Sequence, residues 1–414
     1  VGGDPEKAES FECLPSLADT PFGPLTPARP GNLLVCEGLA SFVYPNTKIT
    51  EVKRVYPGDT DNPVGIEHCL VRGKMNERTS SVDMTTYAIG FEMRLPAEWS
   101  GRFLYQGNGG LDGAVADALG NITGGQLQSG LEMGFAILSS DAGHDNQINP
   151  LFGLDPQARL DYGYQAVGTL TPMAKELIKA AYGRGPDRSY IAGGSNGGRH
   201  TMVAAARYAD QYDGFLALAP GFNLPKAAVA QLWGLQQWAA ISADPANPFM
   251  LGSGFTTPER ELVARAILNR CDALDGIADG MVQDYKRCQQ VFDIERDVPT
   301  CAGGRDDTCL TADQKKVVKT VFAGARKKTG EPIYTSFPYD PGIVSEGWAG
   351  WKFRNSLSLD PGAVGYIFTS PPQLGLGDNN PGALLNFALT ADVDRLADLI
   401  YAKSGIYGES AMEF

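Results

Sequence analysis

The stretch that decides the fold is YIAGGSNGGRHTMVAAARYADQYDG, residues 190–214. It begins with a short apolar run, passes through Gly-Gly-Ser-Asn-Gly and continues into an alanine-rich run. A Gly-x-Ser-x-Gly pattern between a strand and a helix is typical of a nucleophile elbow, where the chain turns so sharply that the flanking residues have to be small. The pattern predicts that Ser195 is a nucleophile. The alternative is a tight turn that happens to contain a serine.

The segments around this turn alternate between strand-like and helix-like patterns. Strand patterns occur at TTYAIGFEMRLP, RFLYQGNGG, GFAILSSDAGH and GFLALAP (residues 85–96, 102–110, 134–144 and 214–220), and a long helix pattern occurs at residues 160–183. This alternation predicts an α/β fold with a mostly parallel sheet and helices on both of its faces. Residues that follow the strands, including Asp141, His144 and Ser195, are then expected near one rim of the sheet.

The regular alternation ends near Phe222, and this change suggests a division of the chain. We expect residues 1–222 to form the first part of the core, and residues 223–388, which are rich in Gly, Pro, Trp and Asp, to form a large inserted lid. A helical pattern resumes after that, so residues 389–414 are expected to return to the core. The chain stops at Phe414 without a turn or a polar tail, which favours an interrupted chain over a natural end on a docked helix.

Composition excludes several functional classes. The net charge is −13, so the chain lacks the basic surface of a nucleic-acid binder. No window approaches the roughly 18 uninterrupted apolar residues of a membrane span. The seven cysteines fit no zinc pattern, and their close placement between Cys271 and Cys309 favours disulfides in an oxidising compartment. We therefore expect a secreted or periplasmic protein that binds neither nucleic acid nor membrane.

An acyl-transfer site also needs two backbone N–H groups that bind the oxyanion. Asn196, the residue after the nucleophile, is the first candidate donor. The second is expected from a glycine-rich loop after an earlier strand, and LYQGNGGLDG (residues 104–113) fits, with Gly109 or Gly110 as the donor. Taken alone, this loop is equally compatible with an ordinary turn.

The chain has only three histidines, and none lies beyond residue 200. His200 lies within the expected nucleophile helix and cannot fold back onto Ser195, so we expect a structural role. We assign no role to His68. His144 precedes the serine, whereas the chain order of an α/β-hydrolase triad is Ser, acid, His, so we expect His144 to structure a loop.

The acidic stretch CDALDGIADGM, residues 271–281, is a candidate cation site. Asp272, Asp275 and Asp279 alternate with glycines that permit a tight curl, in which the carbonyl groups of Ile277 and Met281 can join the carboxylates. Such oxygen ligands favour calcium, although the spacing is not that of an EF-hand. The alternative is a solvated acidic turn.

These motifs together resemble the tannase and feruloyl esterase family of α/β-hydrolases, which also contains the hydrolase of the terephthalate half-ester. The matching pieces run in order over residues 36–414: CEGLASFVYPNTKITEV, HCLVRGKMNER, LYQGNGG, SSDAGH, GGSNGGRH, CDALDGIADG, GWAGWK, TSPP and SGIYGESAMEF. The resemblance implies an α/β-hydrolase core with a large inserted, calcium-binding lid and no organic cofactor.

The resemblance also implies residue roles. Ser195 is the nucleophile, Gly110 and Asn196 supply the oxyanion N–H groups, and the acidic loop is the calcium site. The implied disulfides are Cys36–Cys69, Cys271–Cys288 and Cys301–Cys309, which leaves Cys13 without a partner. The family's catalytic Asp and His would follow Phe414, so a second fragment is expected to supply them. Most members have a cysteine before the nucleophile, where this chain has Gly194, and the change puts local rigidity in doubt.

Substrate choice is expected to come from the lid, where Trp351, Phe368 and Thr369 resemble the family's substrate-facing residues. For the tryptophans Trp348 and Trp351, packing inside the lid is an equal alternative. The terephthalate half-ester hydrolase uses an arginine to bind the carboxylate of its substrate, and here that region contains Val364 and no arginine. This difference favours feruloyl, other hydroxycinnamoyl and benzoyl esters.

We therefore expect a secreted serine carboxylic ester hydrolase that cleaves aromatic acid esters through an acyl-enzyme on Ser195. The alternatives are a tannase-like or mono(2-hydroxyethyl) terephthalate hydrolase-like activity. A non-catalytic, calcium-stabilised binding protein is a further alternative, because the Asp and His of a triad are not found in this chain.

Overall fold

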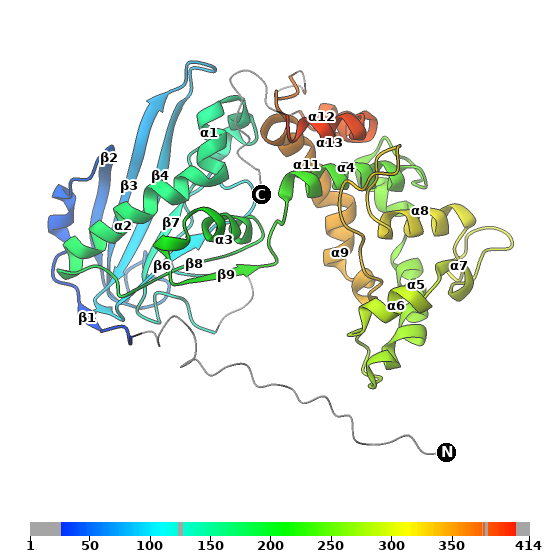
Figure 1. Ribbon diagram of the computed structural model, residues 1–414, viewed down its shortest axis with the longest axis horizontal. Helices are drawn as coiled ribbons and strands as arrows, with labels where there is room; N and C mark the ends of the chain where they lie inside the picture. The colour runs from blue at the N-terminus through cyan, green and yellow to red at the C-terminus, as the bar shows by residue number, and fades with distance from the viewer. Residues whose placement is uncertain (1–25, 123–126, 375, 377–379, 403–414) are drawn as a thin grey trace.

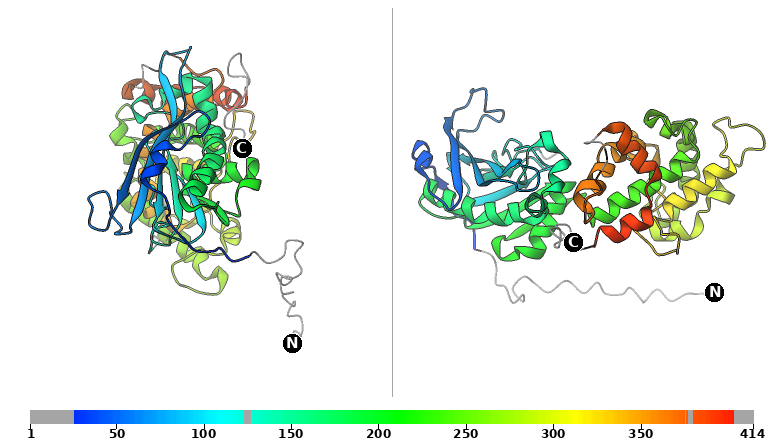
Figure 2. Two further views of the ribbon diagram at one scale, coloured as in Figure 1. Left: turned by 90° about the vertical axis from the view of Figure 1, so that its left-hand side faces the viewer. Right: turned by 90° about the horizontal axis from the view of Figure 1, so that it is seen from above.

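The computed structural model describes residues 26–122, 127–374, 376 and 380–402. They form two regions that lie side by side (Figure 1 and Figure 2): a sheet region within residues 26–221, and a helical region within residues 224–402. The last strand of the sheet region leads into the first helix of the helical region, so the two regions meet at the carboxyl end of that strand.

A seven-stranded sheet forms the centre of the sheet region. In spatial order its strands are β2 (Thr47–Val55), β3 (His68–Thr79), β4 (Thr86–Pro96), β7 (Ala136–Ser140), β6 (Arg102–Gly107), β8 (Arg188–Gly194) and β9 (Gly214–Leu218). The strands from β7 to β9 are parallel, whereas β2, β3, β4 and β7 pair antiparallel. The prediction of a mostly parallel sheet is wrong for this half, because the short connection at residues 80–85 permits only an antiparallel pair. Two short strands, β1 (Gly31–Asn32) and β5 (Glu98–Trp99), pair separately.

One face of the sheet is covered by helices α2 (Ala166–Tyr182) and α3 (Asn196–Arg207) (Figure 1). Leu170 of α2 and Ala204 of α3 belong to the same buried cluster as Phe91 of the sheet. Helix α2 ends at Gly183, whose φ of 75° is a left-handed conformation that glycine adopts at helix ends.

The opposite face is covered by a loop. Side chains of Leu119 and Leu131, from the segment between β6 and β7, pack on Leu104 of the sheet. Gly120 and Gly130 approach so closely that a Cβ on Gly120 would lie 2.7 Å from the Cα of Gly130. The prediction of helices on both faces is therefore wrong for the described residues, because this glycine-pinned segment folds back on itself instead of forming a helix.

The helical region is built around a large buried hydrophobic cluster that also includes Phe152 and Tyr162 of the sheet region. Its helices are α4 (Leu224–Ala239), α5 (Thr257–Cys271), α6 (Tyr285–Val291), α7 (Ile294–Asp297), α8 (Ala312–Phe322), α9 (Glu346–Gly350), α10 (Ser356–Ser358), α11 (Asp360–Gly362), α12 (Pro381–Thr390) and α13 (Val393–Leu399). Helices α5 and α8 each begin with a capping box, at Thr256 and Thr311. Trp348 packs edge-on against Trp238, with ring centroids 6.1 Å apart, so Trp348 belongs to the core of this region.

The last two helices pack on α4 and not on the sheet. Ala388 and Leu396 lie in the buried cluster of the helical region, and Gln236 of α4 donates to the carbonyl groups of Ala388 and Ala391, at 3.1 and 3.0 Å. Residues 389–402 thus bury their apolar faces against α4, and the predicted return of residues 389–414 to the core stays a prediction. Residues 403–414 lie outside the described part of the chain.

A tight joint fixes the helical region to the sheet region. The π-helical turn η11 (Ala363–Phe368) packs on Gly153, where a Cβ would overlap the Tyr366 carbonyl group. The buried guanidinium of Arg159, in helix α1 (Pro156–Leu160), donates to the Thr369 carbonyl at 2.9 Å and to the Ser370 hydroxyl at 3.1 Å. The helical region is thus anchored beside the carboxyl ends of β8 and β9.

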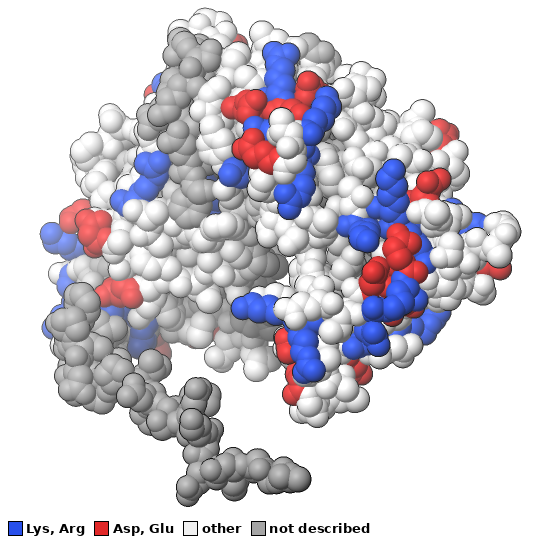
Figure 3. Space-filling model, turned by 45° about the vertical axis from the view of Figure 1, so that its right-hand side comes forward, with Lys and Arg blue, Asp and Glu red and all other residues white. Residues whose placement is uncertain are grey.

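The structure contains three disulfides, Cys36–Cys69, Cys271–Cys288 and Cys301–Cys309, which are the pairs that the family resemblance implies. Cys13 lies outside the described residues. On the face in Figure 3, acidic and basic side chains are interspersed, without a broad basic patch. In the described part of the chain, no helix combines the length and the apolar character needed to cross a membrane.

Candidate active site

Ser195 stands at the sharp turn between β8 and α3. Its φ of 57° and ψ of −122° are unusual for a residue with a side chain, and such strain costs about 1–3 kcal/mol. Residues 191–194 and 196–200 are all buried, whereas Ser195 is exposed. Its N–H donates to Leu218 and its carbonyl accepts from Gly221, both at 3.0 Å, so the segment after β9 holds the turn in place.

Small residues permit this geometry. A Cβ on Gly197 would overlap the carbonyl oxygen of Gly107 at the end of β6, and a Cβ on Gly193 would lie 2.5 Å from the carbonyl carbon of Gly197. Gly198 is equally confined, because its Cβ would lie 2.8 Å from the Cα of Pro220. The glycines that mark the motif in the sequence are therefore required by the close approach of α3 to the sheet.

Two unpaired N–H groups face the same cavity as Ser195. Gly110 has a φ of +65° and Asn196 begins α3, and both residues line this cavity. Among the described residues, neither backbone N–H donates a hydrogen bond. An acyl-transfer site needs such donors for the oxyanion, so the arrangement fits the predicted roles and favours Gly110 over Gly109, which does not line the cavity.

A buried polar network beneath these donors links the glycine loop to α3. The Asp112 carboxylate accepts a hydrogen bond from the Asn196 side chain and lies 3.1 Å from Nε2 of His200. The Asn196 amide oxygen in turn accepts from Nε of Arg199 at 2.6 Å and from the Tyr162 hydroxyl at 3.1 Å. Asp112 follows Gly110 by two residues, so this network fixes the loop that carries one donor against the residue that carries the other.

None of the chain's histidines is placed to activate Ser195. His200 bonds to Asp112, and burial, reinforced by the neighbouring Arg199 charge, lowers its pKa. Burial lowers the pKa of His144 to about 4, and its Nε2 donates to the Leu111 carbonyl at 2.9 Å, so it structures the glycine loop as expected. His68 is buried on β3, where Nδ1 lies 2.7 Å from the Ile66 carbonyl.

The cavity in front of Ser195 has a volume of about 320 Å³ and lies between the two regions. Its aromatic lining residues are Phe222, Tyr334, Phe337, Trp351 and Phe368. Trp351 is 41% exposed, whereas Phe368 is buried. Both side chains line the Ser195 cavity, and their role in binding the substrate stays a prediction.

Thr369 does not share that position. Its side chain is fully buried outside the cavity lining, and its hydroxyl donates to the Gly365 carbonyl at 3.1 Å. Arg159 and η11 hold Thr369 inside the joint between the regions, and a role for Thr369 in binding the substrate stays a prediction.

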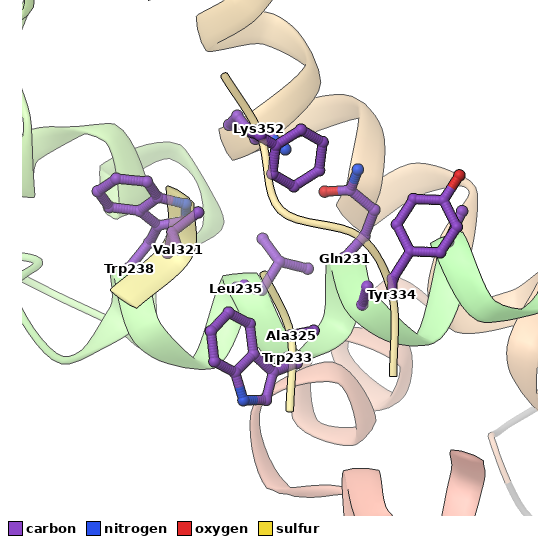
Figure 4. A pocket seen from close by; sticks show the side chains of 12 residues that line it. Gln231, Trp233, Leu235, Trp238, Val321, Ala325, Tyr334 and Lys352 are labelled. Carbon is purple, nitrogen blue, oxygen red and sulfur yellow. The ribbon is translucent and has the colours of Figure 1, made fainter. Parts of the chain in front are cut away.

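A smaller cavity of about 20 Å³ adjoins the main one and shares Gln231, Tyr334 and Phe337 with it. Gln231 approaches this cavity from α4, and Lys352 approaches from the π-helical turn η10 (Trp351–Asn355) (Figure 4). The wall of the main cavity also contains Asp360. Asp360 thus lines the Ser195 cavity and Lys352 lines the smaller cavity beside it, each among mostly apolar residues.

The acidic loop folds around its own backbone. Asp272 accepts from the N–H groups of Asp279 and Gly280, at 3.1 and 3.0 Å, and Asp275 accepts from the N–H of Ile277 at 3.0 Å. The three carboxylates therefore share one exposed loop, without a gathered set of ligand atoms. Within the described residues, one group of three possible metal ligands has its ligand atoms within 4.8 Å of one another. It consists of Cys301, Asp306 and Cys309. The two cysteines of that group are joined in a disulfide, which removes their thiolates.

Four residues of this site were not predicted from the sequence. Asp112 lies inside the quoted glycine loop and Arg199 inside the quoted elbow, so their positions beside the motif were the available signal. Lys352 and Asp360 belong to no local pattern, and only the packing of η10 and α11 brings them to the cavity.

Comparisons with known proteins place these features in context. A sequence profile described as "Tannase and feruloyl esterase" matches residues 69–359. The mono(2-hydroxyethyl) terephthalate hydrolase of Piscinibacter sakaiensis is 34% identical over 91% of this chain and 68% of its own length. A protein of Neosartorya fischeri named probable feruloyl esterase B-1 is 31% identical over 71% of this chain and 54% of its own length. The chain thus spans about two thirds of the first relative and about half of the second.

Solved structures agree on the fold. Feruloyl esterase B from Aspergillus oryzae superposes with a TM-score of 0.66 at 24% identity, covering 89% of this chain and 70% of that one. Tannin acyl hydrolase from Aspergillus niger superposes with a TM-score of 0.56 at 19% identity, covering 84% of this chain and 65% of that one. At these identities the likeness concerns the fold alone.

Proposed function

The chain belongs to the tannase and feruloyl esterase family, whose named members are carboxylic ester hydrolases, and we propose that it cleaves aromatic acid esters through an acyl-enzyme on Ser195. One observation carries this proposal. An exposed serine in a strained elbow shares an aromatic cavity with two unpaired backbone N–H groups, those of Gly110 and Asn196.

In the proposed reaction, Oγ of Ser195 forms a bond to the ester carbonyl carbon while its proton passes to a base. The negative charge that develops on the carbonyl oxygen is stabilised by the N–H groups of Gly110 and Asn196. The carbon–oxygen bond to the alcohol then breaks, and the alcohol leaves with the proton. Water repeats the attack on the acyl-enzyme and releases the acid and the free serine.

The base is proposed to come from a further segment that supplies a histidine and an aspartate. This is supported by the three histidines of the chain, all of which are engaged away from Ser195. It is also supported by the position of β9, which is the edge strand of the sheet among the described residues and carries the exposed side chains Phe215 and Leu216. An apolar strand edge of this kind is suited to pairing with another strand.

The acyl group is proposed to be feruloyl or another hydroxycinnamoyl or benzoyl group. Among the described residues that line the Ser195 cavity there is no Arg or Lys, and the position expected to hold a carboxylate-binding arginine is the buried Val364. A buried substrate carboxylate without a charged partner is costly. Tannase-like and terephthalate half-ester hydrolase-like activities remain the alternatives.

We further propose that the chain has an α/β-hydrolase core, that the helical region acts as its lid and that the acidic loop of the lid binds calcium for stability. The clustering of Asp272, Asp275 and Asp279 on one exposed loop supports this. Chelation should then lower the unfolding temperature of the protein and leave that of Asp275→Ala unchanged. The three disulfides support a secreted or periplasmic location.

The test combines a fluorophosphonate probe with intact mass spectrometry. A single adduct on Ser195, absent from Ser195→Ala, together with hydrolysis of methyl cinnamate and methyl ferulate, is the expected result. If the unaltered chain takes no adduct and cleaves neither ester even with the supplying segment present, a non-catalytic binding protein replaces the proposal. The absence of a base among the described residues is the observation that favours that alternative.

A further inference from the structure

Asp360 is an anomaly in the wall of the Ser195 cavity. It lies in α11, is 8% exposed, and its Oδ2 atom is buried without a hydrogen-bond partner. Burial raises the pKa of this carboxyl well above its usual range, against the opposing influence of Lys352. A buried polar atom left unpaired costs stability, so its presence in a cavity wall needs an explanation.

Lys352 is the second such group. Its Nζ lies 4.2 Å from the centroid of the Phe337 ring, and within the described residues it donates no hydrogen bond. Burial lowers its pKa to about 8, while the Asp360 carboxylate opposes that shift. The two side chains interact electrostatically but do not approach within the 4.0 Å of an ion pair. Asp360 therefore lines the Ser195 cavity and Lys352 lines the smaller cavity, and the two cavities share Phe337 and Gln231. Neither side chain forms a hydrogen bond with the other.

A hydroxyl group has the chemistry to bridge them, because it donates one hydrogen bond and accepts others. A substrate carboxylate is less suited, since it would place a second acid beside Asp360. The aromatic residues nearby, Phe337 and Trp351, suit a ring that carries the hydroxyl. A phenol meets both requirements.

We propose that Asp360 and Lys352 form a polar site that binds the phenolic hydroxyl of a 4-hydroxyaryl acyl group in the Ser195 cavity. The inference rests on the proposed function, which supplies the aromatic ester. It assigns the preference for hydroxylated over unsubstituted acids to two side chains of the helical region.

The test measures binding separately from hydrolysis. In a Ser195→Ala background, calorimetry compares methyl 4-hydroxycinnamate with methyl cinnamate, which differs only by the hydroxyl. We expect the hydroxylated ester to bind about 10- to 100-fold more tightly, as for hydrogen bonds to charged groups. Asp360→Ala should reduce that ratio to nearly one, and Lys352→Met should reduce it several-fold. Asp360→Leu, which is similar in size but cannot form a hydrogen bond, should reduce the ratio to nearly one as well and provides a second variant if the alanine variant does not fold.

The matched control is Leu359→Ala, because Leu359 also lines the cavity but is apolar. It should weaken both esters alike and leave the ratio unchanged. A ratio near one in the background protein, a ratio that Asp360→Ala and Asp360→Leu leave unchanged, or no measurable binding of either ester would overturn the proposal. Tighter binding of monomethyl terephthalate would assign the site to a carboxylate instead. Hydrolysis of methyl cinnamate by the Ser195 protein tests the proposed function separately, since that ester has no hydroxyl.

Discussion

The carboxylate of Asp112 is the most informative side chain to remove. It is buried, it accepts from the Asn196 side chain, and it lies 3.1 Å from Nε2 of His200. Asp112→Ala would leave both of these side chains without a hydrogen-bond acceptor. It would also place alanine at a φ of 50°, a left-handed conformation that aspartate tolerates better.

The magnitude follows from these losses. A buried donor left without an acceptor costs about 1–3 kcal/mol of stability. Because the two donors belong to one network, their combined cost is less than the sum of the two separate costs. We expect Asp112→Ala to reduce the free energy of unfolding by about 3 kcal/mol. Loss of one oxyanion donor typically costs about 100- to 1,000-fold in rate, so a loosened Gly110 should slow Ser195 acylation by at least about tenfold.

The assays are urea unfolding and the rate of fluorophosphonate labelling of Ser195, the labelling being done with the segment that supplies the base present. Asp112→Asn is the control, because its amide oxygen still accepts one of the two hydrogen bonds, and we expect a loss of about 1 kcal/mol. Unfolding of Asp112→Ala within about 0.5 kcal/mol of the unaltered protein would refute the reasoning. An equal loss of unfolding free energy in Asp112→Ala and Asp112→Asn would show that the hydrogen bonds accepted by the carboxylate do not account for its contribution to stability.

Three further predictions concern the elbow, the joint and a buried acid. Gly197→Ala should abolish labelling of Ser195, because its Cβ would overlap a backbone carbonyl, whereas Gly109→Ala, whose Cβ would meet no atom within 4 Å, should label normally. Arg159→Met should destabilise the protein by about 2–4 kcal/mol and speed proteolysis at the joint, because the Thr369 carbonyl loses its buried donor. Burial raises the pKa of Asp141 to about 7, so its folded form holds a proton that the unfolded form releases near pH 4. The contribution of Asp141 to the free energy of unfolding is therefore present below about pH 4 and is lost as the pH rises to about 7. Asp141→Asn should gain stability relative to the unaltered protein across that pH range, as measured by unfolding at several pH values.

Each of these predictions has a contradicting outcome. Normal labelling of Gly197→Ala would show that the elbow can relax. Unchanged proteolysis of Arg159→Met would mean that packing of η11 alone holds the joint. A difference in unfolding free energy between Asp141→Asn and the unaltered protein that stays constant from pH 4 to pH 7 would contradict the raised pKa of Asp141.

Local sequence patterns were reliable where the chain's own covalent neighbours decide the geometry. The glycines around Ser195 predicted a sharp turn, and the structure has that turn, with a φ of 57° at Ser195. The same patterns were misleading about pairing and packing. The antiparallel pairing of β4 with β7, the loop-covered face of the sheet and the packing of α13 on α4 depend on partners distant in sequence, which a periodicity does not specify.

The sequence by itself determined the α/β class, the elbow serine, the glycine loop and, through the family resemblance, the cysteine pairs. Only the tertiary structure decided that Asp112 meets His200 across 88 residues, and that Asp360 stands unpaired in the wall of the cavity. The physical reason is that turns and helix starts are set by interactions between near neighbours. The partner of a buried polar group, in contrast, is set by which distant elements pack together, and that becomes defined only when the whole core has formed.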